Sequence, residues 1–551
     1  MLNIAIAGPM ASGKTTVGKK LAQKLRRPFV DVDQFIEDST GEKVSEIFAK
    51  YGESYFRKLE EEAIERLAEL RGIVIALGGG AVISSKNREI LDSSGIVVML
   101  SASPEEILRR VGEDSTRPLL AGDGKLERIT ALLKEREDYY KSGDLYLDTT
   151  QLSPDQAVDK ICAFLGKFNM PDNHSVEQIV EVEVSPPYSI HIGAGILAKT
   201  GRIVSALAPG SRAIIITNPL LSQLYGYRLE KILSRHGVSA FQYKIGDGEQ
   251  FKEMDQVMSV YDFMASHGVG RDTILIALGG GVVGDLAGFV AATYMRGIRF
   301  IQVPTTLLAQ VDSSVGGKVA VNHPRAKNLI GAFYQPTVVI ADVGTLLSLS
   351  EREYREGLAE VVKYGVIWDS HFFTYLEKNI EAILRRDTDL LTDLVYRCCS
   401  IKAEVVSQDE RDHGIRAYLN FGHTIGHAIE ALAGYGTLRH GEAISLGMMA
   451  AMRLAIRLGL APAADLTKLE RLLGGFGLPI EIREHLGQVR DQTAMAEKRS
   501  QVIQELMDHM ALDKKAKGGK LRFILPRRIG EVTEMEISDV VIRSLLEEML
   551  C

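Results

Sequence analysis

The sequence has few cysteines and no long apolar run. Its four cysteines, among 551 residues, include one adjacent pair and no CxxC spacing. This usage gives no disulfide framework and is typical of free thiols in a reducing compartment. The first ten residues, MLNIAIAGPM, lack the basic segment of a signal peptide, and the apolar stretches are strand-sized rather than membrane-spanning. We therefore expect a cytoplasmic protein.

An excess of positive charge is also lacking. The chain has 65 Lys and Arg against 72 Asp and Glu, for a formal net charge of −7. A protein that follows nucleic-acid phosphates would normally carry a basic excess. We therefore expect small-molecule substrates, with neither nucleic acid nor a membrane as partner, and local basic pockets can still bind small anions. A homodimer formed through the second part of the chain is left open.

Short apolar runs and helical patterns alternate in the first part of the chain. A helix is predicted over Lys14–Leu25, and strands are predicted at Asn3–Ala7, Phe29–Val32, Ile73–Leu77 and Ile96–Leu100. Strands that alternate with helices favour a parallel α/β sheet. We place this first domain at residues 1–166.

A polar segment separates this domain from the rest, and we assign residues 167–178 to a linker. Strict alternation at Val180–Val184 and Tyr188–Ile192 predicts a hairpin that opens a second α/β domain, residues 179–345. Its further strands are predicted at Ala213–Thr217, Thr273–Leu278, Phe300–Val303 and Val338–Ala341. From about Ser350 long periodic segments predict a mainly helical domain, residues 346–551.

The clearest motif runs from Gly8 to Thr15 and fits GxxxxGK[ST]. It follows a predicted strand and opens a predicted helix, which is the context of a phosphate-binding P-loop. Backbone N–H groups and the helix N-terminus face the phosphates, Lys14 adds a cation, and the Thr15 hydroxyl can ligate Mg²⁺. A chance glycine turn is a poor explanation because every fixed position is filled.

Five further features follow the P-loop in order. Asp31 and Asp33 flank one residue at a strand end and are predicted to point to one side. Arg57 and Glu60 share a helix face. The others are a triple glycine after the next strand, an RPLL loop that begins with Arg117, and an RxxxY helix with Arg136 and Tyr140. Each feature alone has an ordinary structural explanation, such as a cap or a surface ion pair.

Together these motifs resemble shikimate kinase over about residues 1–165. The resemblance implies a P-loop kinase sheet related to nucleoside monophosphate kinases and ATP-dependent phosphorylation of shikimate with Mg²⁺. It implies that ATP and Mg²⁺ are bound by Gly8, Gly13, Lys14, Thr15, Thr16 and Asp31. Shikimate would be bound by Asp33, Arg57, Gly79, Gly80 and Arg136, and Asp33 and Arg117 would be catalytic. Ala11 departs from the family, which usually has glycine there.

The second part carries a glycine-rich turn and several histidines. Gly279, Gly280 and Gly281 follow a predicted strand and would let a pyrophosphate approach the backbone, although this signal is weak alone. Glu360, His423 and His440 are metal candidates, because one carboxylate and two imidazoles suit Zn²⁺ or a similar ion. His427 shares a helix face with His423. On spacing alone, two core histidines explain this pair equally well.

Several long runs in residues 179–530 resemble 3-dehydroquinate synthase. They are GGGVVGDLAGFVAATYMRG, VPTTLLAQVDSSVGGKVAVN, KNLIGAFYQP, GLAEVVKYG, LNFGHTIGHAIE and HGEAISLGM. The resemblance implies a Rossmann-like NAD-binding domain followed by a helical metal-binding domain, with NAD and Zn²⁺ or Co²⁺ as cofactors. It assigns the metal to Glu360, His423 and His440. NAD would be bound by Glu249, Lys252, Gly279, Gly280, Gly281, Asp285, Thr305, Thr306, Asp312 and Lys327.

The same resemblance implies a substrate pocket for a seven-carbon keto-acid phosphate. The phosphorylated heptulosonate would be bound by Arg296, Lys318, Asn328, Lys402, Arg416 and Lys514, and the catalytic set would be Lys318, Lys363, Lys402, Arg416, Asn420 and His427. The implied reaction converts 3-deoxy-D-arabino-heptulosonate 7-phosphate to 3-dehydroquinate and phosphate, with NAD regenerated. Many cations suit a substrate with a phosphate and a carboxylate.

Two other functions remain open at this point. A polyol dehydrogenase related to the second part would accumulate NADH, but it has no phosphate to bind and would not need the basic cluster. The first part could instead be an ATP-sensing module that regulates the second. Its full set of acidic and arginine positions argues against that function, because sensing needs only the P-loop.

Overall fold

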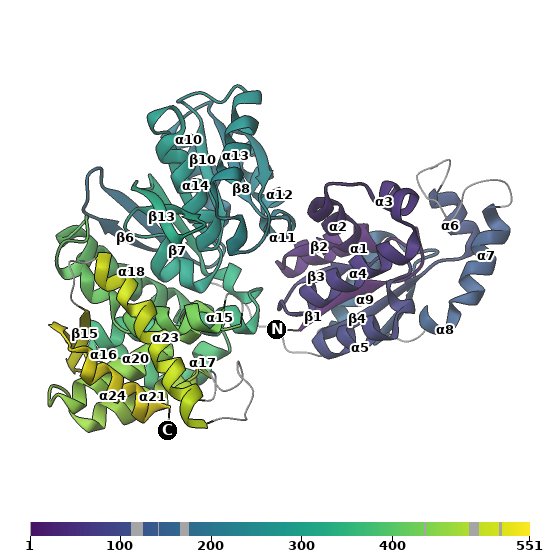
Figure 1. Ribbon diagram of the computed structural model, residues 1–551. Coiled ribbons are helices and arrows are strands. Elements are labelled where there is room, and N and C mark those ends of the chain that lie inside the picture. Colours follow the sequence, from purple (N-terminus) through teal and green to yellow (C-terminus); the bar gives the residue numbers. More distant parts are fainter. Residues whose placement is uncertain are drawn as a thin grey trace.

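The computed structural model describes residues 2–111, 125–140, 143–165, 176–434, 437–483, 495–516 and 521–550. The predicted linker lies largely outside these residues, as do Arg117 and the side chain of Lys514. In Figure 1 the chain forms an N-terminal α/β part, a second α/β part and a helical C-terminal part.

The first part is built on a parallel sheet with strand order β2-β3-β1-β4-β5. Its strands are β1 (Asn3–Ala7), β2 (Phe29–Asp31), β3 (Val74–Ala76), β4 (Gly95–Ser101) and β5 (Leu145–Asp148). The side chains of β1 alternate between two cores. Ile4 and Ile6 pack towards α1 and α9, whereas Ala5 and Ala7 face the core of α4. This alternation is what a strand buried on both faces requires.

The helices of this part connect and cover the strands. They are α1 (Lys14–Leu25), α2 (Val32–Thr40), α3 (Val44–Tyr51), α4 (Glu53–Ala68), α5 (Ser85–Ser94), α6 (Pro104–Val111), α7 (Lys125–Glu135), α8 (Glu137–Tyr140) and α9 (Pro154–Leu165). Two local predictions were wrong. Val32 begins α2 instead of ending the strand, because the Asp31 side chain caps that helix by accepting from the Gln34 N–H. Arg136 lies between α7 and α8 rather than within one helix.

The second part contains a seven-stranded sheet of order β6-β7-β14-β11-β10-β8-β9. The predicted hairpin is confirmed, since β6 (Gln178–Val182) pairs antiparallel with β7 (Tyr188–Gly193). The remaining pairs are parallel. Its other strands are β8 (Arg212–Thr217), β9 (Ser239–Lys244), β10 (Ile274–Gly279), β11 (Arg299–Pro304) and β14 (Val338–Asp342), and a separate hairpin joins β12 (Lys318–His323) to β13 (Ala326–Phe333).

Five helices accompany this sheet: α10 (Thr200–Leu207), α11 (Pro219–Leu221), α12 (Tyr227–Arg235), α13 (Met254–Ser266) and α14 (Gly281–Thr293). A π-helical turn, η4 (Ser222–Gly226), continues α11. The carboxyl ends of parallel strands form one edge of such a sheet, where ligands of doubly wound folds bind. The triple glycine lies there, where β10 ends at Gly279 and α14 begins at Gly281.

The third part is mainly helical, as predicted, and adds an unpredicted hairpin of β15 (Arg522–Arg528) and β16 (Glu531–Glu536). Its helices are α15 (Glu351–Ile367), α16 (Ser370–Lys378), α17 (Ile380–Leu384), α18 (Thr388–Gln408), α19 (His423–Ala433), α20 (His440–Arg457), α21 (Ala463–Gly475), α23 (Met495–Ala516) and α24 (Asp539–Met549).

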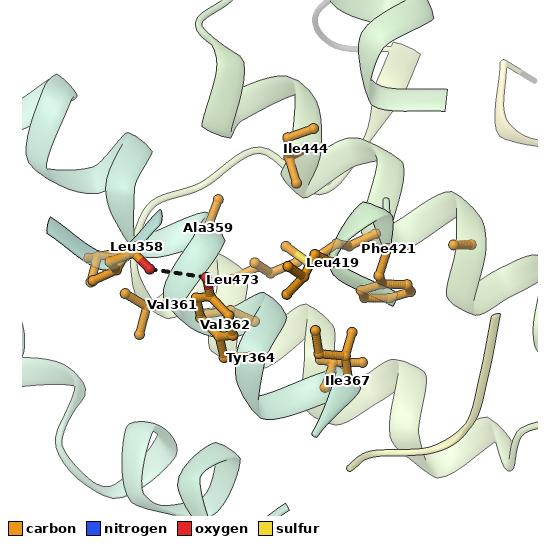
Figure 2. Packing of buried hydrophobic residues seen from close by; sticks show 14 of the residues in the cluster. Leu358, Ala359, Val361, Val362, Tyr364, Ile367, Leu419, Phe421, Ile444 and Leu473 are labelled. Carbon is orange, nitrogen blue, oxygen red and sulfur yellow. Dashed lines mark hydrogen bonds between the residues drawn. The ribbon is translucent and has the colours of Figure 1, made fainter. Parts of the chain in front are cut away.

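The helix α15 is the centre of the C-terminal core. Figure 2 shows its apolar side chains near Leu419, Phe421 and Ile444. Residues 357–367 are all buried, which fixes the position of Glu360 and Lys363 within the helix. Across the described ranges, no helix combines the length and apolarity that a membrane crossing would need.

Candidate active sites

The P-loop includes a backbone conformation that only glycine adopts easily. Gly8 has φ 137°, and a side chain there would clash with the carbonyl oxygen of Leu100. Lys14 Nζ donates to the carbonyl oxygens of Gly8 (3.0 Å) and Pro9 (2.8 Å), so its cation lies over the loop. The Thr15 hydroxyl donates to Asp31 Oδ2 at 2.7 Å, which brings the two predicted Mg²⁺ residues together.

A cavity of about 510 Å³ opens beside the P-loop. Gly13 and Thr16 line it together with residues that the sequence analysis missed: Arg109, Arg110 and the segment from Thr149 to Pro154. Arg110 donates to the carbonyl oxygens of Thr149 (2.7 Å) and Ala11 (3.3 Å), and so joins the P-loop to the end of β5. Only their position after the strands β4 and β5 could have indicated these residues, because no fixed motif contains them.

The predicted acceptor pocket holds two buried carboxylates. Burial raises the pKa of Asp33 to about 6 and that of Glu60 to about 7, although Arg57 partly offsets both shifts. Arg57 pairs with Glu60 at 2.6 Å. Within the described residues, Asp33 Oδ1 and Glu60 Oε1 find no hydrogen-bond partner. Two unsatisfied oxygens inside a pocket are suited to accept hydroxyl groups of a ligand.

The glycines around this pocket leave room for arginine. A side chain at Gly80 would come within 2.5 Å of Arg57 Nη2, so the guanidinium occupies that space. Arg136 lines a small cavity with Met10, Gly79 and Tyr140, and its buried Nε has no hydrogen-bond partner among the described atoms. Asp33, Arg57, Gly79, Gly80 and Arg136 thus surround one region at the carboxyl end of β3.

The metal candidates converge from three helices. His423 Nε2 and His440 Nε2 lie 3.6 Å and 3.8 Å from Glu360 Oε1, which is fully buried and has no hydrogen-bond partner in the described part of the chain. The ligand atoms of His423, His427 and His440 lie within 4.8 Å of one another, with His427 the exposed member. One buried carboxylate oxygen and two imidazole nitrogens fit a divalent ion with open positions.

Hydrogen bonds at the outer nitrogens set the histidine tautomers. His423 Nδ1 donates to the Phe421 carbonyl oxygen at 3.1 Å, which leaves the Nε2 lone pair directed to Glu360. His440 Nδ1 contacts Glu430 at 3.1 Å. Such outer partners are typical of metal-binding histidines. Burial, followed by the charge of Lys363, holds the pKa of His423 well below its usual range, so this imidazole is neutral and able to ligate.

The charge of His440 is set differently. Burial lowers its pKa, but the hydrogen bond that His440 donates to Glu430 and the charge of Glu360 outweigh this effect, and the net pKa is raised. Glu430 also pairs with Lys327 at 2.7 Å. Burial would raise the pKa of Glu430, but His440 and Lys327 together lower it to about 2. Glu430 therefore remains ionised and links a metal candidate to a predicted NAD residue.

Asp312 organises the cations beside the metal site. Lys402 Nζ lies 2.6 Å from Asp312 Oδ1, Lys363 Nζ lies 3.9 Å from it, and the Tyr364 hydroxyl donates to it at 2.9 Å. Lys363 also contacts Glu360. Burial would raise the pKa of Asp312, but the two lysines hold it well below its usual range. The carboxylate therefore stays charged and keeps both buried ammonium groups in place.

Several of the predicted NAD residues lie at the carboxyl edge of the seven-stranded sheet, whereas Lys327 lies in the hairpin strand β13. Lys252 joins Asp285 and Asn328, with its Nζ 2.6 Å from a side-chain oxygen of each. The Thr305 N–H donates to the Gly279 carbonyl oxygen at 3.0 Å, and Thr306 lies against Gly280. Glu249 is linked to Asn328 through Asn322. The Asn322 amide donates to Glu249 Oε1 at 2.7 Å, and its oxygen accepts from the Asn328 N–H at 2.9 Å.

Other predicted phosphate ligands are less tightly grouped. Arg416 is buried and donates to the Gly316 carbonyl oxygen at 2.9 Å, whereas Lys318 is half exposed and pairs with Asp412 at 2.6 Å. Asn420 ends the 3₁₀-helix η9 (Ile415–Asn420), three residues before His423 begins α19. Arg296 is exposed at a kink after α14, and its position beside the others stays a prediction.

Three family models match successive stretches of the chain. The shikimate kinase family model matches residues 10–166, and the N-terminal and C-terminal 3-dehydroquinate synthase models match residues 242–356 and 357–516. The 3-dehydroquinate synthase of Desulforamulus reducens is 51% identical over 345 residues, which cover 63% of this chain and 92% of that protein. That of Geobacter metallireducens is 48% identical over 353 residues, covering 64% and 94%.

Solved structures match the second and third parts. A 2-epi-5-epi-valiolone synthase from Streptomyces hygroscopicus with NAD⁺ and Zn²⁺ bound is 25% identical, with a TM-score of 0.58, and the match covers 69% of this chain and 99% of that one. A 2-deoxy-scyllo-inosose synthase complexed with carbaglucose-6-phosphate, NAD⁺ and Co²⁺ is 26% identical, with a TM-score of 0.59, covering 68% and 100%.

Proposed function

We propose that this chain catalyses two separate reactions at two separate sites. It belongs to the 3-dehydroquinate synthase family and carries a shikimate kinase domain ahead of the synthase part. The first reaction is transfer of a phosphoryl group from ATP to shikimate. The second is conversion of 3-deoxy-D-arabino-heptulosonate 7-phosphate to 3-dehydroquinate and phosphate. The observation that carries the proposal is that each half brings its own set of ligand groups together: the P-loop with Asp33, and Glu360 with His423 and His440.

In the kinase half, phosphate binding is assigned to the P-loop N–H groups and Lys14. Mg²⁺ held near Thr15 and Asp31 would supply charge neutralisation for the transferring phosphoryl group. Asp33, with a pKa of about 6, is ionised near neutral pH and can take the proton of the attacking shikimate hydroxyl. Arg57 and Arg136 would bind the shikimate carboxylate, and Arg117 would stabilise the charge on the phosphoryl group.

In the synthase half, a divalent ion bound by Glu360, His423 and His440 would supply Lewis-acid polarisation of a substrate hydroxyl, and bound NAD would take up and return a hydride. The chain itself binds and orients the substrate. Lys363, Lys402 and His427 border the metal candidates and can hold oxygen atoms of the ring or move a proton there. Phosphate binding is assigned to Arg296, Lys318, Asn328, Arg416 and Lys514.

The two activities can be tested separately on the same preparation. With ATP, Mg²⁺ and shikimate we expect ADP and a phosphorylated product. With the heptulosonate phosphate, NAD and Zn²⁺ or Co²⁺ we expect released phosphate without accumulation of NADH. Net NADH formation would point instead to a polyol dehydrogenase. ATP binding without phosphate transfer would make the first half a sensing module.

Domain limits, assembly and location complete the proposal. We assign residues 1–166 to the kinase, 167–178 to the linker, 179–345 to NAD binding and 346–551 to metal and substrate binding. We further propose a homodimer through the synthase half, which light scattering on the eluted protein would test. A cytoplasmic location agrees with the free thiols of Cys162, Cys398 and Cys399.

A further inference from the structure

The kinase half docks on the NAD-binding half through one edge of its sheet. The strand β2 is the edge strand there, and it contacts the turn η4, while α2 contacts α11. Figure 1 shows α11 and α12 next to β2 and α2. Both of these kinase elements carry an acidic residue assigned to the kinase site, namely Asp31 at the end of β2 and Asp33 at the start of α2.

The first contact reaches the backbone of Asp31. Its N–H donates to Gln223 Oε1 of the turn η4 at 3.0 Å. The same residue accepts from the Thr15 hydroxyl through Oδ2 and caps α2 through Oδ1. A side chain of the synthase half thus fixes the main chain of a residue whose carboxylate faces the P-loop helix.

The second contact lies on α2, five residues beyond Asp33. The Asp38 side chain is only 8% exposed, and Lys244 at the end of β9 pairs with it at 2.7 Å. The Gln223 amide and the Tyr227 hydroxyl each lie 3.4 Å from Asp38 Oδ2. Lys244 is the cation that compensates this buried carboxylate, so its loss would leave an unpaired charge inside the interface.

Apolar side chains also pack across the interface between the kinase half and the synthase half. Phe35 and Ile36 of α2 are 4% and 2% exposed, and they belong to one buried cluster with Leu220 and Leu224 of the synthase half. The helix α2 is therefore held on its outer face by apolar contact and by an ion pair whose carboxylate is buried. It has little freedom to shift along the sheet without breaking both.

We propose that Gln223 and Lys244 are positioning residues for the kinase: they hold β2 and α2, and thereby set the places of Asp31 at the Mg²⁺ site and Asp33 at the acceptor hydroxyl. The synthase half thus completes the kinase site without touching its substrates. This inference rests on the kinase function proposed above. It requires no channelling of an intermediate between the two active sites.

The test uses the full-length chain and two substitutions. Gln223→Ala removes the acceptor of the Asp31 N–H, and Lys244→Met removes the cation beside Asp38. Each should lower kcat/KM for shikimate by roughly 3- to 30-fold and raise the Mg²⁺ concentration needed for half-maximal rate. The synthase rate should stay within about twofold of wild type, which also shows that the variants are folded. Unchanged kinase kinetics in both variants would overturn the proposal.

A control at the same interface separates positioning from docking in general. Arg71 follows α4 and pairs with Glu351 of the synthase half at 3.2 Å, so Arg71→Ala breaks a contact between the halves away from β2 and α2. We expect normal kinase kinetics in this variant, and partial recovery in Lys244→Arg, which keeps the cation. An equal loss in Arg71→Ala would overturn the positioning role. A wild-type chain that fails to phosphorylate shikimate would instead contradict the proposed function itself.

Discussion

At the residue scale, the three histidines near the metal candidates differ in exposure and in hydrogen bonding. His423 and His440 each direct Nε2 to Glu360 and hold an outer partner through Nδ1. His427 belongs to the same cluster but is exposed. This difference supports metal binding by the first two residues and contact with substrate by the third, because less exposed donors with outer partners are better preorganised ligands.

We predict that His423→Asn and Glu360→Gln lose bound metal together with synthase activity, whereas His427→Asn keeps about one equivalent of metal per chain and loses activity alone. Metal content by elemental analysis after gel filtration, with phosphate release measured in parallel, checks this. Kinase activity of the same samples is the internal control. Retention of metal by His423→Asn, or its loss from His427→Asn, would require a different ligand set.

The pKa of Glu60 predicts a pH effect on stability. The folded state keeps its proton up to about pH 7, whereas the unfolded chain releases it near 4.5. Between these values the unfolded state binds fewer protons, so stability falls as pH rises, by roughly 3 kcal/mol across the whole window. Glu60→Gln cannot ionise there, and its kinase transition should lose less stability between pH 5 and 8.

Calorimetry of the full-length chain measures this effect, with the kinase transition identified as the one that ATP and Mg²⁺ shift upward. Glu53→Gln is the matched control, since Glu53 lies on the same helix and pairs with the same Arg57 but is half exposed. Parallel pH curves for wild type and Glu60→Gln would show that Glu60 is not the group responsible.

At the element scale, strongly periodic segments and complete motifs could be predicted from the sequence. Local pattern alone predicts the strand Asn3–Ala7, the helix Lys14–Leu25 and the hairpin that β6 and β7 form. The place of Asp33 could not, because the Asp31 cap converts the predicted strand end into a helix start. The cavity wall at Arg110 and Thr149 depends on contacts across the sheet, which no local spacing records.

Ala11 gives a prediction for the P-loop element. It has φ 56°, a left-handed conformation that costs an alanine roughly 1 kcal/mol relative to glycine. Ala11→Gly relieves this strain and removes a methyl group beside the phosphate cradle, although the unfolded chain gains entropy. We expect ATP to bind equally well or a few-fold tighter, measured by calorimetric titration. Weaker binding would mean that the alanine preorganises the loop.

At the scale of the whole molecule, two independent sets of ligand groups lie in one chain. The P-loop and its acids belong to the first sheet, whereas the metal candidates come from α15, α19 and α20 of the last part. The contacts between the halves that involve Gln223 and Lys244 reach the kinase acids but none of the metal candidates. Arg66 of α4 also pairs with Asp247, two residues before the predicted NAD residue Glu249, so the interface borders both sites but not the metal candidates.

The separation of the interface from the metal candidates predicts the outcome of disabling each site in turn. Lys14→Met removes the P-loop cation and should reduce the kinase rate by at least about 100-fold, with synthase kinetics unchanged. Removal of metal by a chelator, followed by removal of the chelator itself, should abolish synthase activity. The kinase rate, assayed with Mg²⁺ added back, should stay within about twofold, because the interface contains none of the metal candidates. Both rates can be followed in one preparation, before and after metal is restored. A kinase rate that falls and recovers with the metal would show that the dependence runs through the metal site as well.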